Sequence, residues 1–124
     1  MKKIIQTNEA PEAIGCYSQA IQSGNIVYLS GQIPLDPVSM IMVSGIHSQI
    51  HRVFNNLKAV AEAAGGSLDH IVKLTVYLTD ISSLAKVNEL MEAYFTKPYP
   101  ARTSFAVAAL PKNALVEVDA IMVM

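Results

Sequence analysis

The sequence lacks most of the features by which cofactor-binding, secreted and nucleic-acid-binding proteins are identified. Its 124 residues include one cysteine, no tryptophan and 15% charged residues, against about 25% charged residues in a typical domain. One cysteine excludes an intrachain disulfide, which is typical of a reducing compartment. The net charge of −1, with Lys and Arg scattered along the chain, provides no basic patch for nucleic acid.

Targeting and membrane signals are also missing. The start, MKKIIQTNEAPEA, has two lysines but too few apolar residues for a signal peptide. No apolar run reaches the ~18 residues that a membrane span needs. The phosphate loop, the dinucleotide fingerprint and the serine nucleophile elbow are absent. We therefore expect a cytoplasmic protein with no cofactor, no metal, no membrane association and no nucleic-acid partner.

Apolar residues, in contrast, are abundant and make up 52% of the chain. A chain of this length buries roughly two thirds of its unfolded surface. Its interior cannot hide all of this apolar area, so we expect part of it to face another subunit.

Periodicity predicts strands, a helix, a strand, a helix and strands, in that order. Apolar spacings of three and four predict helices over 46–66, ending at Gly65-Gly66, and over 82–95, with Ser82 as N-cap. Strands are predicted in AIQSGNIVYLSGQI, turning at Gly24-Asn25, and in IVKLTVYLT, TSFAVAAL and LVEVDAIMVM. The segment IPLDPVSMIMVSG reads as a loop because two prolines interrupt it. This order predicts an α+β fold with one mixed sheet and both helices on a single face.

Alternation also assigns the strand residues to the two faces of the sheet. In LVEVDAIMVM the apolar face is Val116, Val118, Ala120 and Met122. In IVKLTVYLT one face is expected to hold Val72, Leu74, Val76 and Leu78, and the other Ile71, Lys73, Thr75, Tyr77 and Thr79. The second face is too apolar for open water and too polar for a core, which suits a subunit interface.

Arg102 is the first candidate site residue. It lies just after Pro100, in the nearly uncharged run YPARTSFAVAAL, and burying a guanidinium without a partner costs several kcal/mol. Its planar fork matches a carboxylate in bidentate geometry, and the start of a strand would hold it rigidly. The alternative is a structural ion pair at a surface or an interface.

Glu117 and Asp119 form the second candidate group because residues i and i+2 of a strand share a face. Glu117 could orient or deprotonate a water molecule. Alternatively, both are ordinary strand carboxylates that pair with Arg102 or Lys73. In a hairpin, Arg102 and Glu117 share a face only in some registers, and the sequence does not determine the register.

Three further positions carry polar groups in notable surroundings. Tyr17 and Ser30 each lie near a glycine, Gly15 and Gly31 respectively, which indicates either a close backbone approach or simple turn chemistry. Asn88 interrupts the apolar stripe of the second helix, where its amide needs a partner that is either structural or part of a site wall.

Two other polar features are interpreted as structural. His47 and His51 have the i, i+4 spacing of a metal pair, but they lie on the solvated face of the first helix without an obvious third ligand. Cys16 is expected to be a small filler, because no histidine is placed to activate it.

Taken together, the order and spacing of several segments resemble the RidA family, also called YjgF, of reactive enamine and imine deaminases. These segments are EAIGCYSQAI, YLSGQIPLDP, NLKAVAEAAG, VKLTVYLTD, VNELMEAYF and PARTSFAVAALPKNALVEVDAI. The resemblance covers almost the whole chain. It implies a single RidA-like domain over residues 1–124, a chorismate mutase-like fold, and a homotrimer whose sheets face inward with substrate clefts between subunits.

The resemblance also implies a reaction, the cofactor-free hydrolysis of 2-aminoacrylate-type enamines and 2-imino acids to 2-keto acids and ammonia. Arg102 would bind the substrate carboxylate, Glu117 would hold the attacking water, and Ser104 would contribute its main chain. The remaining cleft residues would be Tyr17, Ser30, Gly31 and Asn88. In the empty site we expect Glu117 to lie near Arg102.

The chain departs from the family pattern at two places. Cys16 stands where the family usually has proline, and residues 39–42 stand where the family commonly has a Gly-containing polar turn.

A non-catalytic small-carboxylate binder or regulator on the same trimer is the alternative function. A translation- or RNA-directed activity is disfavoured by the acidic charge balance.

Overall fold

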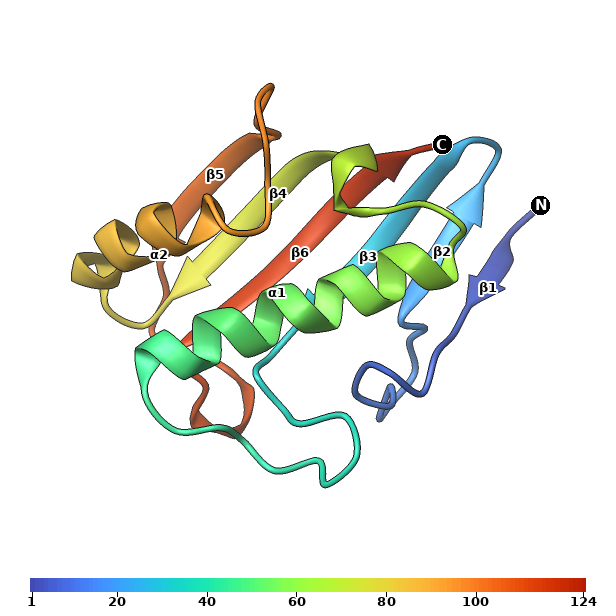
Figure 1. The fold of residues 1–124 in the computed structure, drawn as a ribbon. Helices are drawn as coiled ribbons and strands as arrows, with labels where there is room; N and C mark the ends of the chain where they lie inside the picture. The colour runs from blue at the N-terminus through green and yellow to red at the C-terminus, as the bar shows by residue number, and fades with distance from the viewer.

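A six-stranded sheet with both α-helices on one face forms the framework of residues 1–124 in the computed structural model (Figure 1). The helices are α1 (Ile46–Ala63) and α2 (Leu84–Met91), and short 3-10 turns precede β4, α2 and β6. The strands are β1 (Lys3–Ile5), β2 (Ala20–Ser23), β3 (Ile26–Gln32), β4 (Ile71–Leu78), β5 (Ala101–Ala106) and β6 (Val116–Val123).

The strand order is β1-β2-β3-β6-β4-β5. Only β4 and β5 run parallel, so the sheet is mixed. The α+β prediction is therefore confirmed. The hairpin between β2 and β3 turns at Gly24-Asn25 as predicted, with Gly24 at φ +62°. β1 was not predicted, because its three residues are too few for a recognisable pattern.

The core lies between the sheet and the two helices, with most of the helical side chains from α1. The predicted apolar face of β6 is buried, with Met122 and Val118 fully inaccessible. From the helix side, α1 contributes Ile50, Phe54 and Leu57, which are also fully inaccessible. The helix ends where predicted, because Gly65 adopts φ +92°, a left-handed conformation that few other residues tolerate.

Two local predictions are wrong. The β4–β6 register shifts between Ile71 and Lys73, so that Ile71 is buried and Val72 is 47% exposed, the reverse of simple alternation. The second helix is shorter than predicted, and Ser82 is not its cap. Instead, a carboxylate oxygen of Asp80 accepts the Ser82 N–H and caps a 3-10 turn that leads into α2.

The last two strands do not form a hairpin. β4, α2 and β5 make a crossover unit that places β5 parallel to β4 at the edge of the sheet, and β6 then pairs with the other side of β4. No helix is both long and apolar enough to cross a membrane.

Candidate functional site

The first group of candidate residues surrounds Glu117 on the open face of the sheet, opposite the helices. The β3–β6 register shifts between Leu29 and Gln32, which inserts one extra residue at the Ser30-Gly31 step. A Cβ added to Gly31 would overlap with Oε2 of Glu117 and lie 3.0 Å from its Cδ. Glycine therefore lets the β3 backbone approach the carboxylate this closely. We call Ser30, Gly31 and Glu117 the glutamate half-site.

The charge environment makes Glu117 easier to protonate than an ordinary glutamate. Burial raises its pKa above 4.5, and the neighbouring charge of Asp119 raises it further. Asp119 itself is engaged, because its Oδ2 accepts a hydrogen bond of 2.8 Å from the Tyr77 hydroxyl. That hydrogen bond is the main reason why the pKa of Tyr77 rises to about 12. Glu117 makes no ion pair and remains available to exchange a proton.

Ser30 connects this half-site to the segment that carries Tyr17. Its hydroxyl donates a 2.6 Å hydrogen bond to the Ser18 carbonyl. The Tyr17 side chain is 53% exposed, and its hydroxyl accepts the Ile14 N–H at 3.3 Å. Tyr17 also lines a cavity of about 560 Å³ between the N-terminal segment and residues 37–40. The adjacent Cys16 is exposed, so its interpretation as a filler is wrong.

The second group lies around Arg102, on the helix side of the sheet. Arg102 pairs with the buried Leu74 across the parallel β4–β5 ladder and therefore points toward α2. Its Nη1 donates to the Met91 sulfur at 3.2 Å. It has no carboxylate partner: the one ion pair of the chain joins Lys86 and Glu89.

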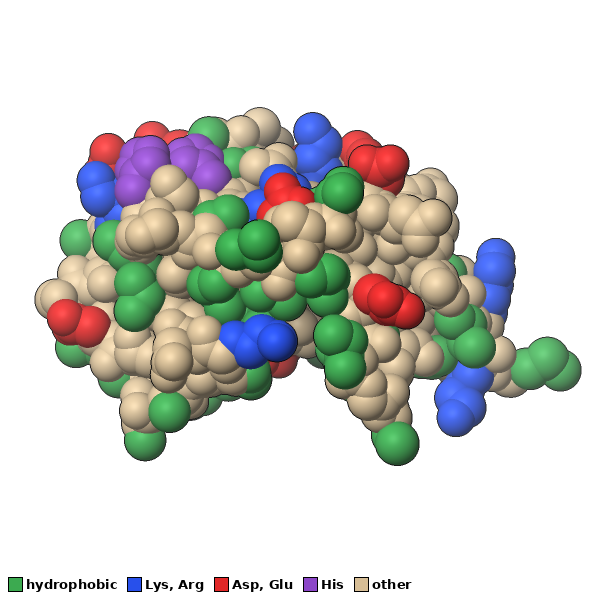
Figure 2. Space-filling model, turned by 90° about the horizontal axis from the view of Figure 1, so that it is seen from below, with side chains coloured by type: hydrophobic (Ala, Val, Ile, Leu, Met, Phe, Trp, Pro, Cys, Tyr) green, Lys and Arg blue, Asp and Glu red, His purple; other side chains and the backbone are tan.

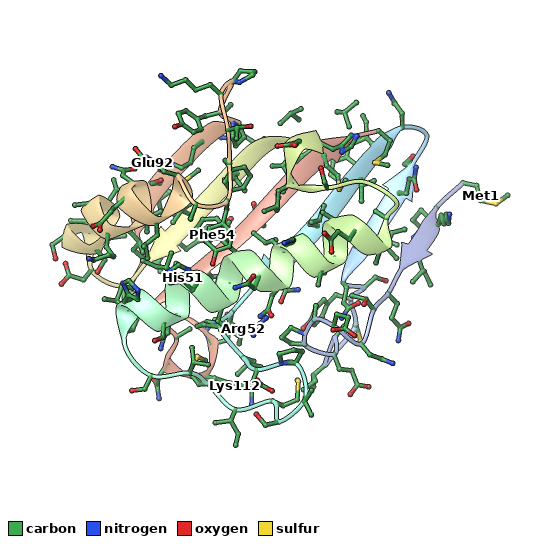
Figure 3. The ribbon with its side chains drawn as sticks, in the orientation of Figure 1. Met1, His51, Arg52, Phe54, Glu92 and Lys112 are labelled. Atoms are coloured by element: carbon green, nitrogen blue, oxygen red, sulfur yellow. The ribbon has the colours of Figure 1, made fainter.

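A cavity of about 390 Å³ opens beside this guanidinium. Glu92, which follows the last turn of α2 (Figure 3), is one of its lining residues. Its lining residues are Asn88, Met91, Glu92, Tyr99, Pro100 and Arg102. Asn88 is exposed and lies on this wall, which is one of the two alternatives considered for its amide. We call Asn88, Arg102 and Ser104 the arginine half-site.

Ser104 contributes to this half-site from the edge strand. The Val107 N–H bonds to the Leu78 carbonyl at 2.8 Å. Because alternate residues of a strand bond to the same side, the main-chain groups of Arg102 and Ser104 lie on the unpaired edge of β5. The Ser104 hydroxyl is buried and has no hydrogen-bond partner.

The two half-sites do not meet within one chain. Arg102 and Glu117 lie on opposite faces of the sheet, with β4 between their strands. Leu74 of β4 pairs with Arg102 on one side and with Ala120 of β6 on the other. Ala120 lies three residues beyond Glu117 along β6. From strand spacing and rise, their Cα atoms are roughly 14 Å apart. Glu117 and Arg102 therefore lie far apart within one chain, and their expected proximity in a cleft between subunits stays a prediction.

The histidine pair lies on the outer surface of α1, where Figure 2 shows adjacent histidine side chains. The His47 and His51 ring centroids are 4.9 Å apart, and Nδ1 of His51 is hydrogen-bonded to the Tyr94 hydroxyl. No group of three or more His, Cys, Asp or Glu side chains is arranged to hold a metal ion.

Two neighbours of the candidate residues were not recognised from the sequence. Met91 is an apolar residue of the second helix, and only the β4–β5 pairing brings Arg102 to it. Tyr77 had been placed on the polar face of its strand, but its pairing with β6 was needed to bring it to Asp119.

Comparison with known proteins gives consistent matches over nearly the whole chain. The model of the family described as Endoribonuclease L-PSP matches residues 7–124. The 2-iminobutanoate/2-iminopropanoate deaminase of Dermatophagoides farinae is 44% identical, over 98% of this chain and 96% of that protein.

Two solved structures extend this likeness to three dimensions. RidA from an Antarctic Psychrobacter species is 49% identical, with a TM-score of 0.97 over 98% of this chain and 99% of that one. E. coli TdcF with bound serine is 39% identical, with a TM-score of 0.94 over 98% of both chains.

Proposed function

Because this chain belongs to the RidA/YjgF family, we propose that it hydrolyses 2-aminoacrylate-type enamines and 2-imino acids to 2-keto acids and ammonia. The relative from Dermatophagoides farinae carries the name of a deaminase for 2-iminobutanoate and 2-iminopropanoate. Both compounds are small carboxylates with a C=N bond. Their hydrolysis therefore requires a group that binds the carboxylate and a group that accepts and donates a proton.

The observation that carries this proposal is that the chain holds both groups without charged partners. Arg102 faces a cavity, and the hydrogen bond that its side chain donates goes to a thioether. Glu117 is half-buried with a raised pKa. A half-buried charge without a partner is costly to maintain, which favours a ligand as the missing partner of Arg102.

The substrate is proposed to bind between subunits, because one small molecule cannot contact both half-sites of one chain. The arginine half-site of one subunit would meet the glutamate half-site of the next. A head-to-tail contact forms a ring when its rotation closes, and the proposed ring is a homotrimer. The unpaired edge of β5 supports this assembly, as do the exposed aromatic rings of Tyr28 (50%) and Phe105 (41%).

In the proposed mechanism, Arg102 binds the carboxylate through two parallel hydrogen bonds and so orients the imine carbon. Glu117 and the Ser104 carbonyl hold a water molecule against that carbon. As the water attacks the protonated imine, Glu117 accepts one of its protons, and a tetrahedral amino alcohol forms. Glu117 then returns this proton to the nitrogen. Ammonia leaves as Glu117 takes the hydroxyl proton, and the 2-keto acid forms. Such general-base assistance contributes ~10²–10⁴-fold.

The experiment that tests this function couples a dehydratase that releases 2-aminoacrylate-type products to the protein and follows ammonia and keto-acid release. We expect the wild type to accelerate release with 3-carbon and 4-carbon imino acids. Arg102→Lys should abolish the acceleration while the oligomer persists, because an ammonium cannot reproduce the bidentate fork. If Arg102→Lys loses assembly together with activity, the arginine is structural and the proposal fails.

A non-catalytic carboxylate binder is the second candidate, and TdcF with bound serine favours it, because a relative there holds a small amino acid. In that case serine or 2-oxobutanoate would bind to the wild type and not to Arg102→Lys, and ammonia release would stay at the uncatalysed rate. The name of the family model suggests RNA cleavage instead. Salt-dependent RNA binding at physiological ionic strength would support that activity.

A further inference from the structure

Met91 is the side chain to which the Arg102 guanidinium donates a hydrogen bond within the chain. Nη1 of Arg102, on β5, donates to the Met91 sulfur, on the last turn of α2, over 3.2 Å. A thioether is a weak acceptor, whereas a guanidinium has five N–H donors. Met91 can therefore support the guanidinium without competing against a carboxylate ligand.

Packing holds the sulfur at this place. Met91 is 6% exposed and belongs to the buried cluster that includes Val87 and Phe95. It also lines the cavity beside Arg102. The thioether is thus fixed by the core on one side and borders, on the other, the space in which a ligand of Arg102 would bind.

Oxidation would change the character of this contact. Hydrogen peroxide transfers one oxygen atom to a sulfur lone pair, so that the thioether is oxidised to a sulfoxide and the peroxide is reduced to water. The sulfoxide oxygen is a strong hydrogen-bond acceptor, in contrast to the sulfur. Because the sulfur already lies 3.2 Å from Nη1, the added oxygen would lie within hydrogen-bonding reach of the guanidinium or displace it.

We propose that Met91 is a positioning residue for Arg102, and that its oxidation to the sulfoxide reversibly weakens carboxylate binding at Arg102. The oxidised side chain occupies N–H donors that the substrate carboxylate would otherwise use. This inference rests on the proposed function, since it requires Arg102 to bind the substrate carboxylate.

Two substitutions at Met91 separate the parts of the proposal. Met91→Gln places a permanent carbonyl acceptor beside the guanidinium. It should raise KM about tenfold, the value for losing one hydrogen bond to a charged group, with a smaller effect on kcat. Met91→Leu removes the sulfur. It should raise KM a few-fold through lost positioning and make the protein insensitive to peroxide at this site. Met124→Leu is the matched control, because Met124 is 39% exposed and lies against Gly65 and Gly66, away from Arg102.

In the experiment, tag-free wild type, Met91→Leu and Met124→Leu are treated with hydrogen peroxide, which is then removed. Binding of 2-oxobutanoate is measured by calorimetry, imine deamination by the coupled assay, and oxidation at each methionine by peptide mass spectrometry. We expect wild type and Met124→Leu to lose affinity about tenfold in proportion to Met91 sulfoxide. Methionine sulfoxide reductases should restore it, and Met91→Leu should not change.

Three results would overturn the inference. One is Met91 sulfoxide with unchanged affinity and KM. Another is an equal peroxide effect in Met91→Leu. The third is a loss that follows dissociation of the oligomer rather than KM, which would indicate a purely structural role. If untreated wild type neither binds 2-oxobutanoate nor deaminates imines, the proposed function fails and the inference fails with it. If untreated wild type is active and only the Met91 effects are absent, the inference alone fails.

Discussion

Substitution of Gly31 by alanine would move the carboxylate of Glu117 without removing it. The new Cβ would overlap with Oε2, lie 3.0 Å from Cδ and lie 3.2 Å from Cγ of Glu117. The glutamate side chain is flexible and half-buried, so it can yield where the β3 backbone cannot. We expect the carboxylate to shift by about 1 Å, a displacement that costs catalysis about 10²-fold.

The effect of this substitution on stability should be small. Replacement of glycine by alanine raises the free energy of unfolding by about 0.4–1 kcal/mol, because it restricts the unfolded chain. Displacing Glu117 lowers it by a similar amount, because the displaced side chain leaves its preferred rotamer. The free energy of unfolding should therefore change by less than about 1 kcal/mol, which urea denaturation at a fixed protomer concentration can measure.

A kinetic double-mutant cycle with Glu117→Ala completes this test. Gly31→Ala should reduce kcat in the wild-type background and cause no further loss in the Glu117→Ala background, because the moved group is then absent. The reasoning is refuted if Gly31→Ala keeps wild-type kcat. It is equally refuted if the substitution reduces kcat by the same factor in both backgrounds.

Three further predictions follow from the same contacts. Ser104→Ala should raise the free energy of unfolding in urea by about 1 kcal/mol, because it removes a buried hydroxyl without a partner; a destabilised variant would show that the hydroxyl is bonded. Stability should fall as pH rises from 10 to about 12, because the unfolded state releases the Tyr77 proton first; a Tyr77→Phe variant with the same decline would contradict this. The rate should fall as acid protonates Glu117, with a midpoint above the ordinary 4.5 that moves down in Asp119→Asn; an unmoved midpoint would exclude the role of Asp119.

Local pattern was sufficient for much of the fold. The alternation in β6 placed Glu117 and Asp119 on the face opposite Val118, and the helical spacing of α1 identified its buried side. Each of these assignments depends on neighbours within a few residues of the chain. For the same reason the Gly24-Asn25 hairpin was predicted correctly.

The relation between the candidate residues could not be predicted, because it depends on pairing between distant strands. Arg102 points toward α2 only because β5 pairs in parallel with β4, and β6 occupies the other side of β4. The register shift between Ile71 and Lys73 likewise buries Ile71 and exposes Val72, whereas alternation alone predicts the opposite. The sequence therefore pointed to Arg102 and Glu117 as candidates, and the sheet order showed that they are separated within one chain.

The central claim, that each site combines Arg102 of one subunit with Glu117 of another, is tested most directly by mixing two inactive variants. Arg102→Lys and Glu117→Gln proteins are unfolded together, reassembled in equal amounts and compared with each variant alone in the coupled assay. Random assembly should restore about a quarter of wild-type activity, the chance that an intact Arg102 meets an intact Glu117 across an interface. A mixture no more active than its separate components would contradict the account.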